Sequence, residues 1–366
     1  MRYIDEYRNA DAVRILAEKI STACRGQWAI MEVCGGQTNT ILRYGLEELL
    51  PDKIRIVHGP GCPVCVTPLE IIDRAISISR EKNIILVSYG DMLRVPGSEG
   101  DLLSAKAEGA DVRIIYSPLD ALKIAKNEKD KKVVFFAVGF ETTAPANAQA
   151  VIWALEKKIN NFFMLCSHML VLPAVDMILS STESRIQGIL APGHVCTVAG
   201  YEGFIKLSEK HHVPIAVTGF EPVDILQGIL YVTEMLEKKE YRVINQYSRS
   251  VKRFGNTQTR KIIERVYEIT DRNWRGIGVI PKSGLKMKDE FREFDAERVF
   301  KIEMQTSRES AGCIAGEVLR GVKKPFECKL FGSVCVPARP SGAPMVSSEG
   351  TCAAYYRNKK YIRAQT

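Results

Sequence analysis

The sequence has no apolar run long enough to cross a membrane. A transmembrane helix needs about 20 apolar residues, whereas the apolar runs here are short, such as residues 133–140. The N-terminus also lacks the apolar core and small-residue cleavage site of a secretory signal peptide. We therefore expect a soluble, cytoplasmic protein with no membrane partner.

Fingerprints of nucleotide and radical chemistry are also missing. No Gly-x-x-x-x-Gly-Lys-Ser/Thr phosphate loop occurs, and Gly59-Pro60-Gly61 continues as a cysteine motif rather than as a dinucleotide-binding turn. A Cys-x-x-x-Cys-x-x-Cys radical motif is absent too. These functions have no direct support from the sequence.

The basic excess is small. Lysine and arginine number 51 against 43 acidic residues, which gives a net charge of +8. The densest basic stretch is the tail, with Arg357, Lys359, Lys360 and Arg363. A nucleic-acid-binding face interleaves basic and aromatic residues, and no such patch is seen, so we expect no nucleic-acid partner.

Cysteine, by contrast, is plentiful, with ten residues in a chain of 366. A chain of this length buries enough apolar surface to fold without disulfides, and a reducing cytosol keeps thiols free. Clustered cysteines in such a protein more often bind metal or do redox work. Cys24 and Cys166 lie outside any motif and are interpreted as core residues.

Short β-branched runs alternate with longer helical patterns. The predicted strands are residues 28–33, 54–57, 84–88, 112–116, 133–138, 162–166 and 214–218. The predicted helices are residues 11–24, 68–82, 102–109, 144–157, 225–236 and 259–269. This alternation indicates an α/β fold with largely parallel sheets.

The length predicts two or three domains. We predict two Rossmann-like α/β units, residues 25–128 and 129–230, and a mainly helical C-terminal unit, residues 231–366, which becomes rich in cysteine, glycine and proline. The helix within residues 1–24 could pack on any of the three and is grouped with the third.

Cys34 begins a glycine-rich turn directly after a predicted strand, in Glu-Val-Cys-Gly-Gly. Ligands of open α/β sheets bind beyond the carboxyl ends of the strands, and free backbone N–H groups in such a turn would lower the pKa of the thiol. An inert core cysteine is the alternative, but the two glycines favour a functional thiol.

Two further motifs follow strands in the same way. Cys62 and Cys65 form a Cys-x-x-Cys pair after Gly-Pro-Gly, which suits either a small disulfide or metal chelation. His194 lies in Pro-Gly-His, where an imidazole can act as ligand or proton carrier, although a lone histidine is usually structural. Nearby Cys196 could join it or simply pack in the core.

Four cysteines remain in the last part of the chain: Cys313, Cys328, Cys335 and Cys352. Four thiolates satisfy a [4Fe–4S] cluster or a structural zinc. Their spacings are much wider than the roughly two to four residues of paired zinc ligands, which favours a cluster and makes the third unit an iron–sulfur domain. Two structural disulfides are the alternative, which a reducing compartment disfavours.

The longer motifs resemble those of the HypD family of hydrogenase maturation factors. They are residues 31–38, 59–68, 90–97 (Gly-Asp-Met-Leu-Arg-Val-Pro-Gly), 116–121, 139–145 (Gly-Phe-Glu-Thr-Thr-Ala-Pro), 192–195, 273–276 and 345–356. The resemblance covers nearly the whole chain. It implies an assembly factor with redox activity rather than a conventional enzyme.

The resemblance also implies a specific task. Members of this family, with the small chaperone HypC, carry the Fe(CN)2CO group destined for [NiFe]-hydrogenase, and HypE donates the cyanides. By position, Cys34 resembles the thiolate that binds this iron, Cys62 and Cys65 the redox pair, and His194 the nearby histidine. The four C-terminal cysteines resemble the ligands of a [4Fe–4S] cluster.

Some positions depart from the family pattern. Gln37 and Asn39 stand where many members have histidine, so no role of those imidazoles is carried over to this chain. Ala315 and Pro344 stand where extra cysteines are common, which leaves four C-terminal cysteines.

Two alternative functions stay open. One is a cluster-dependent thiol–disulfide oxidoreductase acting on a protein, which would have little use for Cys34 on its own turn. The other is a structural zinc protein, which would lack the brown colour of a cluster after anaerobic purification.

Overall fold

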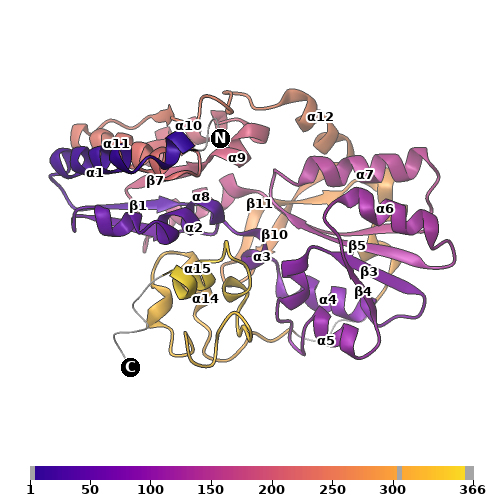
Figure 1. Ribbon diagram of the computed structural model, residues 1–366. Helices are drawn as coiled ribbons and strands as arrows, with labels where there is room; N and C mark the ends of the chain where they lie inside the picture. The colour runs from indigo at the N-terminus through magenta and orange to yellow at the C-terminus, as the bar shows by residue number, and fades with distance from the viewer. Residues whose placement is uncertain (1–4, 303–306, 359–366) are drawn as a thin grey trace.

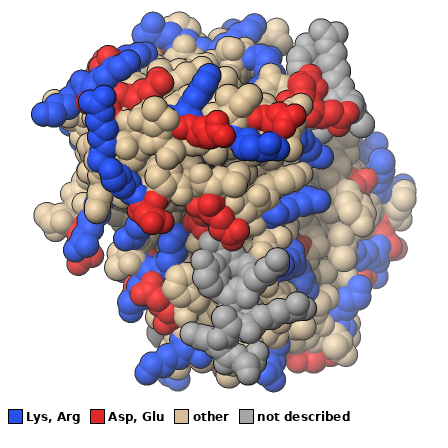
Figure 2. All heavy atoms as spheres, turned by 60° about the vertical axis from the view of Figure 1, so that its left-hand side comes forward, with Lys and Arg blue, Asp and Glu red and all other residues tan. Residues whose placement is uncertain are grey.

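The computed structural model describes residues 5–302 and 307–358, and it consists of two β-sheets with helices on their faces and a less regular C-terminal region (Figure 1). Lys359, Lys360 and Arg363 of the basic tail lie outside the described residues. On the face drawn in Figure 2, Lys and Arg are interspersed with Asp and Glu. None of the helices in the described ranges has the length and apolar character needed to cross a membrane.

The first sheet is entirely parallel and has the strand order β2-β1-β7-β8-β9. Its strands are β1 (Trp28–Glu32), β2 (Ile54–His58), β7 (Gly188–Pro192), β8 (Ile215–Thr218) and β9 (Val243–Asn245). Helices α1 (Ala10–Ala23), α2 (Gly35–Arg43) and α11 (Pro222–Lys238) pack on one face. Helices α8 (Val171–Ser180), α9 (Gly193–Ala199) and α10 (Glu202–His211) pack on the other.

The second sheet has the order β10-β11-β6-β5-β3-β4. Its parallel strands are β3 (Ile84–Ser88), β4 (Asp111–Ile114), β5 (Lys132–Gly139) and β6 (Phe162–Met169), and the hairpin of β10 (Tyr267–Trp274) and β11 (Gly278–Met287) adds antiparallel strands at β6. One face carries α6 (Pro118–Asn127), α7 (Ala144–Glu156) and α12 (Thr257–Val266), and the other carries α4 (Leu69–Ser79) and α5 (Leu102–Ala107).

The mixed α/β fold with largely parallel sheets is confirmed, and all seven predicted strands are present. The parallel strands read as continuous apolar runs because both of their faces are covered; β3, for example, is buried throughout. Local signals also set helix starts: Ser117 caps α6, Pro118 occupies its first turn, and Asp120 completes a capping box.

The two sheets do not follow the predicted boundaries 25–128 and 129–230. The first sheet takes strands from residues 28–58 and 188–245, and the second from residues 84–169 and 267–287. The β10–β11 hairpin also lies in the part predicted to be mainly helical. Alternation along the chain predicts that strands form, but strand neighbours depend on long-range packing that alternation does not encode.

The C-terminal region packs beneath the first sheet, where α15 (Thr351–Asn358) contacts α2 (Figure 1). It also contains α14 (Ala315–Leu319) and the short 3-10 helices η5 (Pro325–Glu327) and η6 (Ala343–Met345), whereas α13 (Ala296–Val299) packs against β6 of the second sheet. One hydrophobic core extends from the first sheet to Phe140, Met169 and Trp274 of the second. The chain segment between β2 of the first sheet and β3 of the second carries the Cys-x-x-Cys motif. Cys62 and Cys65 belong to this core.

Candidate metal-assembly site

Cys34 and the Cys-x-x-Cys turn lie side by side at the carboxyl end of the first sheet. Cys34 is the N-cap of α2, directly after β1, and Cys62 is the N-cap of α3 (Pro63–Val66), which follows β2. The Gly35 N–H donates to the Gly61 carbonyl oxygen at 2.9 Å. Because β1 and β2 are parallel neighbours, their ends deliver both motifs to one edge.

Gly61 permits this close approach. A Cβ atom at this position would lie 2.2 Å from the Cys34 nitrogen, closer than atoms can approach. We expect Gly61→Ala to separate the two turns and to lower the free energy of unfolding by about 1–3 kcal/mol, as measured by chemical denaturation. Gly90→Ala is the matched control because its Cβ would meet nothing closer than 3.9 Å. Equal stability of the two variants would contradict this packing.

The predicted histidine reaches the predicted thiol from a different strand. His194 starts α9 after β7, and its Nδ1 lies 3.5 Å from Cys34 Sγ. Burial lowers the pKa of His194 to about 4, so the ring is neutral at neutral pH. Phe220 lies against it, with 5.3 Å between ring centroids. A neutral imidazole beside a thiol can accept its proton or act as a second ligand.

The expectation of a lowered pKa for Cys34 is wrong. Cys34 is buried, and burial raises the pKa of its thiol well above the ordinary value, although the backbone N–H groups of Gln37 and Gly36 oppose the rise. The negative charges of Glu32 and Glu349 raise the pKa further. A thiol in such a site stays protonated until a cation arrives, because the bound metal favours the thiolate.

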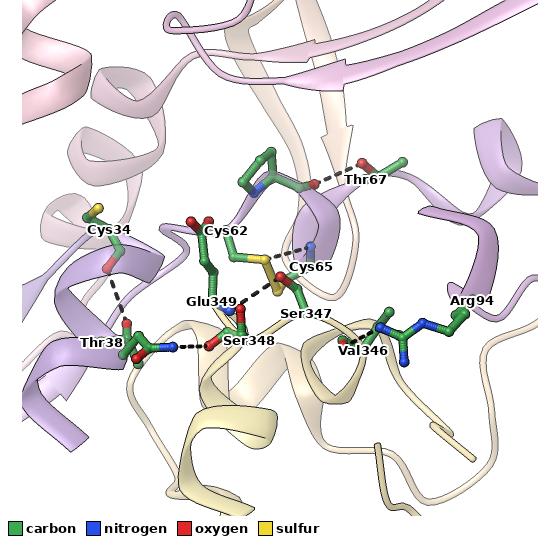
Figure 3. Close-up of a disulfide and its surroundings, with 12 residues drawn as sticks. Cys34, Thr38, Cys62, Cys65, Thr67, Arg94, Val346, Ser347, Ser348 and Glu349 are labelled. Atoms are coloured by element: carbon green, nitrogen blue, oxygen red, sulfur yellow. Dashed lines mark hydrogen bonds between the residues drawn. A yellow bond between two sulfur atoms is a disulfide. The ribbon is translucent and has the colours of Figure 1, made fainter. Parts of the chain in front are cut away.

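Cys62 and Cys65 are joined in a disulfide that is almost completely buried (Figure 3). The Cys62 sulfur also accepts the Cys65 N–H at 3.3 Å, which closes the first turn of α3. The sequence suited either a small disulfide or metal chelation at this pair, and the structure contains the disulfide. Cys196 packs in the same core and does not join His194, and Cys24 and Cys166 are buried core residues as predicted.

Sequence analysis missed two acidic residues at this edge. Glu32 is fully buried, and its Oε2 accepts the Cys34 N–H at 2.8 Å. Glu349 comes from the C-terminal region and packs so closely on Gly35 that a Cβ there would lie 2.4 Å from its own Cβ (Figure 3). An acidic residue in an apolar strand was the available signal for Glu32. Glu349 gave none, because only the tertiary fold brings it here.

Gln37 and Asn39 act as structural anchors. Gln37 Nε2 donates to Thr218 Oγ1 at 2.6 Å and so ties α2 to the end of β8. Asn39 Nδ2 donates to the Ser348 carbonyl oxygen at 3.0 Å and ties α2 to the C-terminal region. Neither side chain contacts Cys34 Sγ through a hydrogen bond among the described residues.

The four C-terminal cysteines surround a single cavity. Cys313, Cys328, Cys335 and Cys352 line it, and the rest of the lining is apolar. Burial and the three neighbouring thiols raise the pKa of Cys352 well above the ordinary value. In the described ranges, no three Cys, His, Asp or Glu side chains lie close enough to share a single metal ion; the four sulfurs line a cavity instead.

A single short helix separates this cavity from the disulfide. Pro344 and Met345 of η6 line the cavity, and η6 packs against α3, which carries Cys65. Arg94 holds the adjoining segment by donating to the Val346 carbonyl oxygen at 3.2 Å (Figure 3). The fold therefore places three sulfur-bearing features, the Cys34 turn, the disulfide and the cysteine cavity, around the junction of the first sheet with the C-terminal region.

The match to known proteins extends over nearly the whole chain. Residues 11–359 match the family described as HypD, hydrogenase formation hypA family. The chain belongs to the HypD family of hydrogenase maturation factors. It is 43% identical over 365 residues to hydrogenase maturation factor HypD of Azotobacter vinelandii, covering 97% of this chain and 96% of that protein. It is 42% identical over 368 residues to HypD of Escherichia coli, covering 98% and 99%. The resemblance predicted from the motifs is thus confirmed.

Proposed function

We propose that this HypD-family protein is a scaffold on which an iron centre for hydrogenase is assembled and carried. The observation that carries the proposal is the convergence of three kinds of sulfur site in one region: a lone thiol beside a histidine, a disulfide, and a cavity lined by four thiols. A chain that only folds around its cysteines would not need three chemically different arrangements so close together.

The iron with its two cyanides and carbon monoxide is the cargo, and Cys34 is its attachment point on this chain. Thiolate is a soft ligand that suits low-spin iron and disfavours hard cations such as magnesium. Burial of Cys34 and of most of His194 keeps water and competing ligands away. A small HypC-type chaperone would supply a further ligand, and a HypE-type protein the cyanides.

The residues around the cavity lined by the four C-terminal cysteines fit a [4Fe–4S] cluster. The donor set is four thiols, and the remaining lining, such as Leu330, Phe331 and Met345, is apolar, as sulfur-ligated clusters favour. Cys313, Cys328, Cys335 and Cys352 would hold the cluster. When bound, it supplies single electrons to its surroundings.

Cys62 and Cys65 would cycle between disulfide and dithiol during assembly. Reduction takes two electrons and two protons and breaks the S–S bond, leaving two thiols. Burial of the pair shields it from small cytosolic thiols, so electrons would come through the protein. The packing of η6 between α3 and the cysteine cavity supports a short path.

Mass spectrometry under controlled redox poise tests this step. After alkylation, we expect the mass of the peptide that contains Cys62 and Cys65 to show a disulfide under oxidising conditions and two labelled thiols under reducing ones. The reduced fraction should rise with the cluster present and fall in Cys335→Ser. A pair that stays in one state at every potential would contradict the proposed redox role.

A further inference from the structure

A chain of charged and polar groups runs beneath the Cys34 turn toward the C-terminal region. We call it the His58 network and define it as Glu32, His58, Glu47, Lys324 and Tyr355. The imidazole at its centre has a side chain that is 1% exposed, and Glu32 is fully buried. Buried charges are costly unless they are paired, so their retention here needs an explanation.

Glu32 connects the network to Cys34. One carboxylate oxygen accepts the Cys34 N–H at 2.8 Å, and the other accepts the Thr38 hydroxyl and lies 2.7 Å from His58 Nδ1. A single side chain thus fixes the end of β1, the first turn of α2 and the end of β2. His58 and the backbone nitrogen of Cys34 therefore contact the same carboxylate group.

His58 bridges two carboxylates. Its Nε2 lies 3.3 Å from Glu47 Oε1, opposite the contact with Glu32. Burial lowers the pKa of His58, but the hydrogen bond to Glu32 and the nearby carboxylate of Glu47 outweigh burial and leave the pKa above the ordinary value. The imidazole and Lys324 each lie 3.3 Å from the same oxygen of Glu47.

The far end of the network belongs to the C-terminal region. Lys324 Nζ lies 3.3 Å from Glu47 Oε1 and donates to the Ile56 carbonyl oxygen at 2.8 Å. The Tyr355 hydroxyl donates to Glu47 at 3.3 Å, and its ring meets the edge of His58 with 5.6 Å between centroids. Both residues therefore hold Glu47 and His58 from the C-terminal side.

These two residues share segments with cluster cysteines. Lys324 caps η5, whose C-cap is Cys328, and Tyr355 lies in α15 with Cys352. Both cysteines line the four-thiol cavity. A change that fixes the positions of η5 and α15 therefore also fixes Lys324 and Tyr355, which both contact Glu47.

We propose that His58 is a positioning residue that couples the four-cysteine cavity to the Cys34 turn. Filling the cavity fixes η5 and α15, these hold Glu47 and His58, and Glu32 then holds Cys34 in its buried setting. The metal-dependent part of this inference rests on the proposed function of the cavity. The coupling is reciprocal, so occupation of the Cys34 site also favours the ordered cavity.

Alkylation of Cys34 by iodoacetamide tests the coupling. The rate is measured in the full-length, metal-free protein, and peptide mass spectrometry follows the modification of Cys34 alone. We expect His58→Gln and Lys324→Met each to raise this rate about threefold or more, and the double variant to react no faster than the faster single variant. Multiplicative effects would overturn the proposal. Lys323→Met is the matched control, because Lys323 pairs with Glu317 outside the network, and it should leave the rate unchanged.

A second arm repeats the measurement after reconstitution with iron and sulfide. We expect loading to slow alkylation of Cys34 in the wild type and to have no effect in His58→Gln. Equal slowing in both proteins would overturn the proposal. If the wild type takes up no iron, the proposed function fails, while the comparison of single and double variants in the metal-free protein still decides the role of His58. If His58→Gln does not fold, Lys324→Met, Glu47→Gln and their double variant provide the same comparison.

Discussion

Anaerobically prepared Cys335→Ser protein is expected to lose the proposed [4Fe–4S] cluster. Cys335 is buried, and its sulfur is one of four that line the cavity, where it accepts the Ser341 N–H at 3.2 Å. A serine hydroxyl is a hard ligand that does not replace thiolate for iron. Iron and acid-labile sulfide, about four of each per wild-type chain, should fall to a small fraction, and the brown colour should disappear.

The matched control for this experiment is Cys24→Ser. Cys24 is also buried but follows the end of α1, in the core that α1 shares with α11, and it does not line the cavity. Its iron and sulfide content should equal that of the wild type. Zinc in place of iron in the wild type, or an unchanged cluster in Cys335→Ser, would contradict the assignment.

Loss of the cluster should also lower the free energy of unfolding, because binding to the native state alone stabilises that state.

Cys34→Ala is expected to abolish the cargo iron and to leave the cluster intact. The substitution removes the thiol at the end of β1 and leaves a small apolar side chain in the core. When the protein is purified with the proposed HypC-type chaperone, iron above the cluster complement should fall to background, and hydrogenase activity in cells should disappear. Metal analysis and an activity assay measure the two effects.

Cys196→Ala serves as the control for Cys34→Ala. Cys196 is also fully buried, and it lies on α9 two residues from His194, but it packs in the core between the sheets. It should retain both kinds of iron. An equal loss in both variants would mean that the effect comes from damaged packing and not from a missing ligand.

Much of this region follows from the sequence because its motifs end parallel strands. Cys34 and Cys62 both follow apolar runs, and parallel strands deliver their carboxyl ends to the same edge of a sheet. Four cysteines among glycines and prolines likewise predicted a common metal site, and in the structure all four line one cavity. These features depend on local order along the chain.

The rest depends on burial and on distant segments. The pKa of Cys34 was misjudged because the N–H groups of its turn are visible in the sequence, whereas the core that buries it is not. His58 directly precedes the motif of residues 59–68, yet its contacts with Glu47 and Tyr355 involve other parts of the chain and are not visible in the sequence. The interleaved sheets arise in the same way, because residues 188–245 return to pair beside β1.

Infrared spectroscopy of the protein purified without oxygen together with the proposed HypC-type chaperone tests the central claim most directly. Sulfur ligation of a half-built iron centre predicts bands in the cyanide and carbonyl stretching regions that are absent from Cys34→Ala. A wild-type complex that contains cluster iron but shows no such bands, or bands that persist in Cys34→Ala, would contradict the account.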